Sequence, residues 1–307
     1  MPLLALYDLP APAKLNLFLH VVGRRADGYH LLQSVFVLID WCDHLHFELR
    51  HDGQLARHDL NTPLPVDDLC LRAARLLQQV SNCTLGADIS IAKQIPSGAG
   101  MGGGSSDAAT VLLALNRLWG LNWTRLRLAT LGLQLGADVP FFVQGHNAFV
   151  EGVGDLIRPM RIPISGFAVV KPPASLPTRE IFEHPLLKRD HEAATLAGSF
   201  DGTGLTDWPA DWGTGFGNND LQPAAQDRCP EVAQAARWLE ARYGNSRMTG
   251  SGSAVFARTG FDNGKPVPPL TASTASMTIA MDELPPDWTG RICHSLQQHP
   301  MRGWAAD

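Results

Sequence analysis

The most chemically informative segment of the chain is a run of glycines. Residues 96–107 read PSGAGMGGGSSD, with five glycines among the seven residues 98–104. Glycine has no Cβ atom, so its backbone can approach a bulky anion, and the start of a helix offers unpaired N–H groups and partial positive charge. We therefore predict a phosphate-binding loop; a flexible surface turn is the alternative. The residues assigned to this loop are Pro96, Ser97, Gly98, Ala99, Gly100, Met101, Gly102, Gly103, Gly104, Ser105 and Ser106.

Two common phosphate motifs do not fit this segment. The spacing Gly98-x-Gly100-x-x-Gly103 matches the dinucleotide-binding motif, but that motif expects an acidic residue about 20 positions later. No Asp or Glu occurs between Asp107 and Asp138. The Walker pattern requires a Lys after the last glycines, and Gly104 occupies that position. The loop therefore belongs to a third class.

A lysine and an aspartate are the candidates for acid–base chemistry. Polar and apolar residues alternate over residues 14–21, which predicts a strand with Lys14 and Asn16 on one side. Asp138 precedes Val139-Pro140, a pattern typical of a helix start. Lys14 could therefore lie at a sheet edge, and Asp138 could be an N-cap. In phosphoryl transfer, however, a carboxylate can also accept the proton of the acceptor hydroxyl.

The elements that position these groups are short strands and longer helices. Runs of strands followed by runs of helices favour an α+β fold over a regular βαβ alternation. Ser105 or Ser106 is the expected N-cap of the helix after the loop, and Gly136 and Gly244 are expected at helix C-termini. We predict strands at 14–21, 33–41, 45–50, 88–95, 147–151 and 167–171, a strand–turn–strand unit at 247–258, and helices at 67–80, 105–119, 123–135 and 231–243.

The length of 307 residues predicts about two domains. The pattern is broken by Arg158-Pro159 and Ile162-Pro163, which places the boundary near residues 155–165. The stretches 198–219 and 260–268 are rich in polar and turn-forming residues and are predicted to be loops.

Composition excludes several classes of protein. Apolar residues make up 45% and charged residues 18%, which argues against a disordered chain. The net charge is −5 and no basic block is present, so neither nucleic acid nor a membrane surface is an expected partner. Five cysteines without a CxxC pair suggest a reducing compartment. There is no signal-peptide pattern, and no apolar run approaches the roughly 18 residues of a membrane span. A cytoplasmic location is expected.

Three motifs together resemble the GHMP kinases, the group that includes galactokinase, homoserine kinase and mevalonate kinase. They are PAKLNL at 12–17, PSGAGMGGGSSDAA at 96–109 and MTGSGSAVFA at 248–257. The resemblance implies a two-domain α+β fold with the active site in the cleft between the domains. The N-terminal domain, residues 1–160, would be ribosomal-S5-like and would bind ATP. The C-terminal domain, residues 161–307, would be ferredoxin-like.

Longer segments are similar to one branch of this group. That branch phosphorylates the 2-hydroxyl of 4-diphosphocytidyl-2-C-methyl-D-erythritol in the non-mevalonate isoprenoid pathway. The segment RRADGYH at 24–30 is the most specific element, since the wider group lacks it. The implied ligands are ATP, with Mg²⁺ arriving alongside it and no dedicated protein metal site, and a cytidine diphosphate-linked methylerythritol. Alternatives are a GHMP kinase that acts on another small alcohol and a non-catalytic ATP-binding sensor.

The resemblance also implies roles for individual residues. Lys14 and Asp138 would be catalytic, with Asp138 as the acid/base. Tyr29 and Phe182 would enclose the cytosine base while His30 bonds its edge, although Tyr29 could instead be a partly buried anchor. The family usually has Asn at Asp68, so no contact with the nucleotide base is assigned there. Further implied substrate contacts are Asn16, Thr178, Gly250, Ser251 and Gly252, of which the last three could also form a simple hairpin turn.

Overall fold

A long antiparallel hairpin forms the backbone of the N-terminal part. The computed structural model describes residues 3–196, 205–209, 215–259, 261–262, 265–266 and 284–307. Strand β1 (Ala5–Arg24) pairs with β2 (His30–Arg50) along almost its whole length. The register shifts at Pro12/Ala13 and again at Asn16/Leu19. These irregularities flank Lys14 and Asn16, and bulges of this kind often redirect side chains next to a functional site.

The hairpin belongs to a seven-stranded sheet. Strand β1 pairs along one edge of β2. Along the other edge of β2, β5 (Ala148–Gly152) pairs with its first part and β4 (Gly86–Ala92) pairs with its last part. The parallel strand β3 (Leu55–Asp59) lies outside β4. Beyond β5 lie β6 (Leu156–Arg161) and β8 (Thr206–Asp207).

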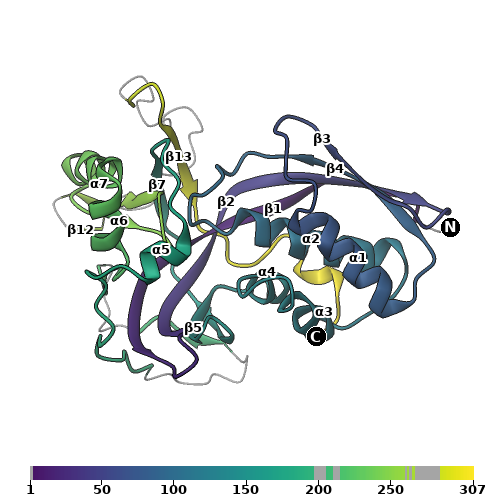
Figure 1. Cartoon of the computed structure of the whole chain (residues 1–307), viewed down its shortest axis with the longest axis horizontal. Helices are drawn as coiled ribbons and strands as arrows, with labels where there is room; N and C mark the ends of the chain where they lie inside the picture. Colours follow the sequence, from purple (N-terminus) through teal and green to yellow (C-terminus); the bar gives the residue numbers. More distant parts are fainter. Residues whose placement is uncertain (1–2, 197–204, 210–214, 260, 263–264, 267–283) are drawn as a thin grey trace.

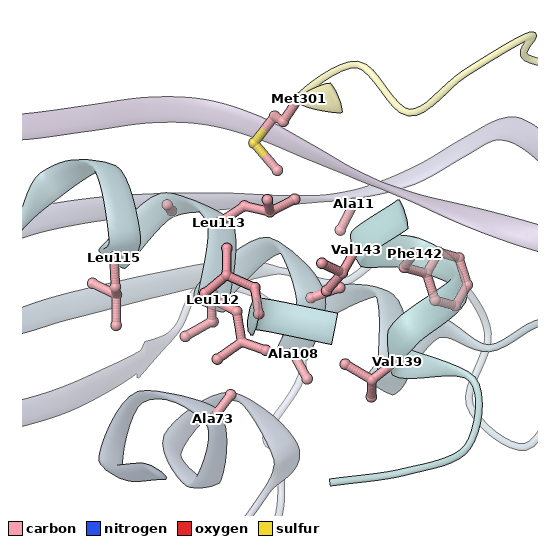
Figure 2. Packing of buried hydrophobic residues seen from close by; sticks show 14 of the residues in the cluster. Ala11, Ala73, Ala108, Leu112, Leu113, Leu115, Val139, Phe142, Val143 and Met301 are labelled. Atoms are coloured by element: carbon pink, nitrogen blue, oxygen red, sulfur yellow. The ribbon is translucent and has the colours of Figure 1, made fainter. Parts of the chain in front are cut away.

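Four helices cover one face of this sheet (Figure 1). They are α1 (Leu69–Ser81), α2 (Gly103–Leu118), α3 (Arg125–Gly132) and α4 (Val139–Gln144). Helix α2 is buried on nearly all sides from Ser106 to Leu118, as expected for a helix whose surface is apolar all round. Figure 2 shows Leu112 and Leu113 of α2 among side chains of α1, α4 and β1. The helix that starts at the glycine loop is therefore central to the hydrophobic core beneath this sheet.

A second, four-stranded antiparallel sheet forms the C-terminal part. Its order is β13 (Thr289–His294), β7 (Gly166–Lys171), β10 (Val255–Thr259) and β9 (Arg247–Met248). Helices α5 (Thr178–Phe182), α6 (Gln222–Arg228) and α7 (Pro230–Tyr243) lie beside it (Figure 1). A short pair, β11 (Phe261–Asp262) and β12 (Lys265–Pro266), follows β10.

The last residues of the chain return to the N-terminal part. Leu296 N–H donates to the Leu38 carbonyl, and Met301 joins the core around α2. The short 3₁₀ helix Arg302–Trp304 follows, and the buried Arg125 guanidinium donates to the carbonyls of Arg302 and Ala305. No helix in the described residues is long and apolar enough to cross a bilayer. The domain boundary near residue 160 stays a prediction.

The α+β class is confirmed, and several element boundaries are corrected. The predicted strands 33–41 and 45–50 are one strand, β2, because β1 continues beside it without a break. The predicted N-cap serines are wrong, because Gly102 is the N-cap of α2 and the Ser106 hydroxyl donates to the Pro12 carbonyl. Gly136 does not cap α3, which already ends at Gly132.

Two predictions for the C-terminal part of the chain are confirmed. Gly244 is the left-handed C-cap of α7, as predicted. The strand–turn–strand unit is confirmed as β9 and β10. Of the two predicted loops, residues 198–204, 210–214, 260, 263–264 and 267–268 lie outside the described residues. The described parts of both loops contain short strands, β8 in the first and β11 and β12 in the second.

Candidate active site

The glycine loop lies between β1 and the loop that joins β9 to β10. On one side, Lys14 N–H donates to the Met101 carbonyl over 3.0 Å. On the other side, Ser253 N–H and Ala254 N–H donate to the carbonyls of Gly98 and Ala99, over 3.1 and 3.2 Å. The three motifs that suggested the GHMP resemblance are therefore hydrogen-bonded to one another through their backbones.

This arrangement requires glycine at the points of closest approach. Gly100 has φ +72°, and a Cβ atom there would lie 2.4 Å from the Thr249 carbonyl oxygen. Gly250 has φ +55°, and its Cβ would lie 2.6 Å from the Gly100 carbonyl oxygen. Residues other than glycine rarely adopt a positive φ, and a backbone oxygen cannot move aside as a flexible side chain can. Some loop glycines thus make room for the facing protein backbone.

A pocket of about 480 Å³ opens where the glycine loop meets the starts of α1 and α2. Its size falls within the usual range of ligand pockets. All of the residues 96–105 line it, together with Asp68, Arg72, Lys93 and Asp107. The sequence therefore located one whole wall of this pocket.

Asp68, the departure from the family's Asn, has a structural role. Its carboxylate caps α1 by accepting from Cys70 N–H and Leu71 N–H, over 3.2 and 3.1 Å. It also forms an ion pair of 2.7 Å with Arg57, whose side chain is 8% exposed. The negative charge at this position is therefore balanced within the protein.

A buried triad of charged residues lies beneath the loop. Lys93 Nζ donates to the carboxylates of Asp43 and Asp107. Asp43 also accepts from Gln94 N–H and Ile95 N–H, which fixes the backbone that enters the loop. Burial raises the pKa of Asp107 to about 8; Lys93 opposes this shift and Asp43 adds to it. Asp107 therefore holds its proton more strongly than an ordinary aspartate does.

Lys14 and Asp138 lie together, as the resemblance implied. Lys14 is 4% exposed, and its Nζ donates to Asn16 Oδ1 over 2.6 Å. Asp138 Oδ2 lies 3.6 Å from that nitrogen, and the Phe36 ring centroid lies 4.5 Å from it. Burial lowers the pKa of Lys14, and Asp138 opposes only part of this shift.

The interpretation of Asp138 as a helix N-cap is correct for its position but not for its hydrogen bonding. The residue occupies the N-cap position of α4, but its side chain makes no capping hydrogen bond. Its carboxylate instead faces Lys14 and is 30% exposed. A carboxylate that is accessible from solvent and paired with a buried ammonium is a plausible proton acceptor.

Helix α5 connects the residues expected at the substrate. At its start, Thr178 Oγ1 lies 2.8 Å from Ser251 Oγ. At its end, the Phe182 ring stacks on His30, with centroids 5.1 Å apart. Tyr29 is 65% exposed, and His30 rather than Tyr29 is the ring packed on Phe182. The roles of these residues stay predictions.

The histidine of this group has a defined protonation pattern. Arg189 Nε donates to His30 Nε2 over 3.0 Å, so this ring nitrogen must be an acceptor. Partial burial lowers the pKa of His30, and Arg189 and Arg24 lower it further. His30 therefore carries its proton on Nδ1 and is neutral near pH 7.

Sequence reasoning missed several buried polar residues at the site, among them Asn219 and Thr249. The Asn219 side-chain amide donates to the carbonyls of Met248 and Gly250 over 2.7 and 2.8 Å, which holds the C-terminal glycine loop. Thr249, fully buried, bonds Asn16. The signal for Asn219 was the NND sequence within a polar stretch, which looks like an ordinary turn.

Comparisons with known proteins show the family of the chain. The model of the GHMP kinases N terminal domain matches residues 68–146, and the model of the GHMP kinases C terminal matches residues 206–265. The chain is 58% identical to the 4-diphosphocytidyl-2-C-methyl-D-erythritol kinase of Methylibium petroleiphilum, over 99% of this chain and 100% of that protein. It is 56% identical to the enzyme of the same name from Variovorax paradoxus, over 98% and 99% of the two chains.

Solved structures give the same result. A crystal structure of 4-(cytidine 5'-diphospho)-2C-methyl-D-erythritol kinase matches with a TM-score of 0.67 and 33% identity, over 81% of this chain and 88% of that chain. A homoserine kinase from Cytophaga hutchinsonii matches with a TM-score of 0.63 and 15% identity, over 96% and 95%. The second likeness shows the shared fold alone.

The contact between the two glycine loops can be tested by adding one methyl group. Gly100→Ala should lower the free energy of unfolding by more than about 3 kcal/mol, because backbone strain and overlap with the Thr249 carbonyl add together. Gly120→Ala is the matched control: Gly120 has φ +64°, but no atom of the part of the chain that the structure describes lies within 4 Å of the added atom. It should cost only the strain, about 1–2 kcal/mol. Urea unfolding measures both, and equal losses would contradict the proposed contact.

The triad predicts a pH dependence of stability. The pKa of Asp107 is about 8 when folded, against an ordinary value of 3.8, so the folded state binds more protons between these pH values. Stability that is present below about pH 4 should therefore be lost progressively up to about pH 8, by on the order of a few kcal/mol. Asp107→Asn should flatten this decline, whereas Asp67→Asn, at an exposed position, should not. Denaturant unfolding from pH 5 to 8 tests this, and parallel curves for all three proteins would refute it.

Proposed function

The chain belongs to the GHMP kinases, in the family of the 4-diphosphocytidyl-2-C-methyl-D-erythritol kinases, and we propose that Lys14 and Asp138 carry its reaction. The enzyme transfers a phosphoryl group from ATP to the 2-hydroxyl of 4-diphosphocytidyl-2-C-methyl-D-erythritol, giving the 2-phosphate and ADP. The observation behind this residue assignment is the pair itself. A buried ammonium lies 3.6 Å from a partly exposed carboxylate, next to the glycine loop.

Phosphoryl transfer depends mainly on position and charge. Asp138 accepts the proton of the 2-hydroxyl as the oxygen attacks phosphorus, so the nucleophile is generated beside the phosphoryl group that is transferred. Lys14 supplies positive charge to the transferring group, and burial makes that charge more effective. The asymmetry between the two groups fits these roles, since Lys14 is held from several sides while Asp138 stays accessible.

The ATP phosphates fit the glycine loop and the start of α2. The pocket beside the loop is lined by backbone of residues 96–104, and the helix start adds unpaired N–H groups. Gly104 faces open space apart from Leu69 at 3.6 Å, unlike Gly100 and Gly250, which face backbone. We assign the phosphates to the segment around Gly104 rather than to the tightly packed start of the loop.

Mg²⁺ is proposed to enter with ATP. The described residues contain no group of three or more His, Cys, Asp or Glu that could hold a metal ion by themselves. The Ser105 hydroxyl suits a hard cation better than that of Ser106, which is buried and donates to the Pro12 carbonyl. The ion would neutralise charge on the phosphates.

We assign the cytidine end of the substrate to residues at the start of β2, on α5 and in the loop between β9 and β10. His30, neutral with its proton on Nδ1, can donate to one acceptor of a pyrimidine base. The exposed Tyr29 ring offers a stacking face, and Thr178 with Ser251 offers hydroxyls to the diphosphate. Phosphate-linked parts of the substrate would thereby approach Gly250–Gly252.

The general-base assignment is tested with Asp138→Asn. This change keeps the shape of the side chain but removes the proton acceptor, so kcat should fall by about 10²–10⁴. The melting temperature, measured on the same samples, reports any loss of stability separately: no capping bond can be lost, but the ion pair with the buried Lys14 is removed. Lys14→Met is the companion variant, and the double mutant should be little worse than the worse single mutant. An Asp138→Asn enzyme that keeps more than about a tenth of wild-type kcat would exclude Asp138 as the base.

The substrate assignment is tested with aromatic truncations. Tyr29→Ala and Phe182→Ala should raise KM for the cytidylylated substrate by about tenfold to a hundredfold, the usual value of base–aromatic stacking. KM for ATP should change little. Tyr7→Ala removes another exposed tyrosine, far along β1, and serves as the control. A coupled assay for ADP, run with the cytidylylated substrate and with plain alcohols, gives these constants. Turnover of plain alcohols at the same efficiency would contradict the proposed base recognition.

A further inference from the structure

A closed set of hydrogen bonds surrounds Asn16, the residue next to the catalytic lysine. The backbone N–H of Asn16 donates to Thr249 Oγ1 over 2.9 Å. The Thr249 hydroxyl in turn lies 3.3 Å from Asn16 Oδ1, and Lys14 Nζ donates to the same Oδ1 over 2.6 Å. On the other side of the amide, Asn16 Nδ2 donates to Ser34 Oγ over 2.8 Å, and the Ser34 hydroxyl donates to the Phe18 carbonyl.

The direction of every proton in this set follows from its two backbone ends. A backbone N–H can only donate, so the Thr249 oxygen accepts from Asn16 and its single proton is left for Asn16 Oδ1. A carbonyl can only accept, so the proton of Ser34 goes to Phe18 and the Ser34 oxygen accepts from Asn16 Nδ2. The amide of Asn16 therefore has one satisfied orientation, with its oxygen towards Lys14.

Burial makes this orientation costly to lose. Asn16 is 1% exposed, Ser34 2% and Thr249 0%. Water therefore cannot replace a missing partner, and an unsatisfied buried polar group is unfavourable. If the amide were turned over, its NH₂ group would face the ammonium of Lys14, and donor would meet donor.

We propose that Thr249 and Ser34 are positioning residues that fix the carbonyl of Asn16 against Lys14. The proposal rests on the assignment of Lys14 to phosphoryl transfer. Neither hydroxyl needs to touch the substrate, since each acts through Asn16. Thr249 belongs to the C-terminal glycine loop, and Asn219 holds the carbonyls of its two neighbours, Met248 and Gly250. The C-terminal part of the chain thereby helps to determine the state of a lysine on β1.

The kinetic test removes one hydroxyl without changing the shape of the side chain. Thr249→Val should lower kcat by about tenfold or more, because it leaves the buried Asn16 N–H without an acceptor and removes the proton that holds Asn16 Oδ1 in place. KM for ATP should change less than threefold. Thr249→Ser restores the hydroxyl and should recover most of kcat. Thr110→Val is the matched control, since Thr110 is also fully buried but its hydroxyl has no partner among the described residues, and this variant should keep full activity.

A second measurement reads Lys14 without any turnover. The ¹³Cε signal of Lys14, assigned by its absence in Lys14→Met, is titrated in the substrate-free protein. The titratable group that faces Lys14 is Asp138, and burial already lowers the pKa of the lysine. Loss of the ordered carbonyl disfavours the ammonium further, so Thr249→Val should lower this pKa by about one unit and Thr249→Ser should not.

These outcomes distinguish the positioning role of Thr249 from the catalytic role of Lys14. A lowered pKa in Thr249→Val with recovery in Thr249→Ser supports the positioning role, even if Lys14→Met proves active and the catalytic assignment fails. An unchanged pKa and unchanged kcat in Thr249→Val would overturn the positioning role. A loss of kcat that Thr249→Ser does not restore, with the pKa unchanged, would overturn it as well, because the side chain would then act only through packing.

Discussion

Close backbone contact between two glycine loops is the constraint on which the site depends. Gly100 and Gly250 approach each other so closely that a single Cβ atom on either would overlap a backbone oxygen. Because the loops are in contact, the carbonyl of Met101 can meet Lys14 N–H while Thr249 meets Asn16 N–H. Strand β1 is thus held from two sides at Lys14 and Asn16, and its irregular register there is stabilised by partners outside the sheet.

The two buried lysines, Lys93 and Lys14, show how neighbouring groups set the pKa of an ammonium. Lys93 contacts two carboxylates, which outweigh burial and raise its pKa. Lys14 faces one carboxylate at 3.6 Å and a neutral carbonyl, and its pKa is lowered. The first arrangement suits a permanent structural charge that fastens the base of the loop. The second disfavours the charged form of Lys14, the residue that we assign to phosphoryl transfer.

The sequence predicted the α+β class, the glycine loop and the pairing of Lys14 with Asn16, because these depend on local patterns. It did not predict that β2 is continuous or that Gly102 starts α2, because tertiary contacts decide both. Asn219 and Thr249 were missed for a similar reason. Their roles come from partners far away in the chain, and a polar residue in a turn looks the same whether it is solvated or buried.

The return of the chain end to the N-terminal core affects how the protein can fold during synthesis. The ribosome produces the glycine loop and α2 early, yet Met301 fills part of the core beside them and the carbonyls that satisfy Arg125 follow at Arg302 and Ala305. Until residues 301–307 leave the exit tunnel, the N-terminal half therefore has an incomplete core, and the Arg125 guanidinium lacks all of its partners in the described residues except the Val143 carbonyl. Nascent chains stalled before residue 300 should accordingly be good clients for chaperones that bind exposed apolar surface.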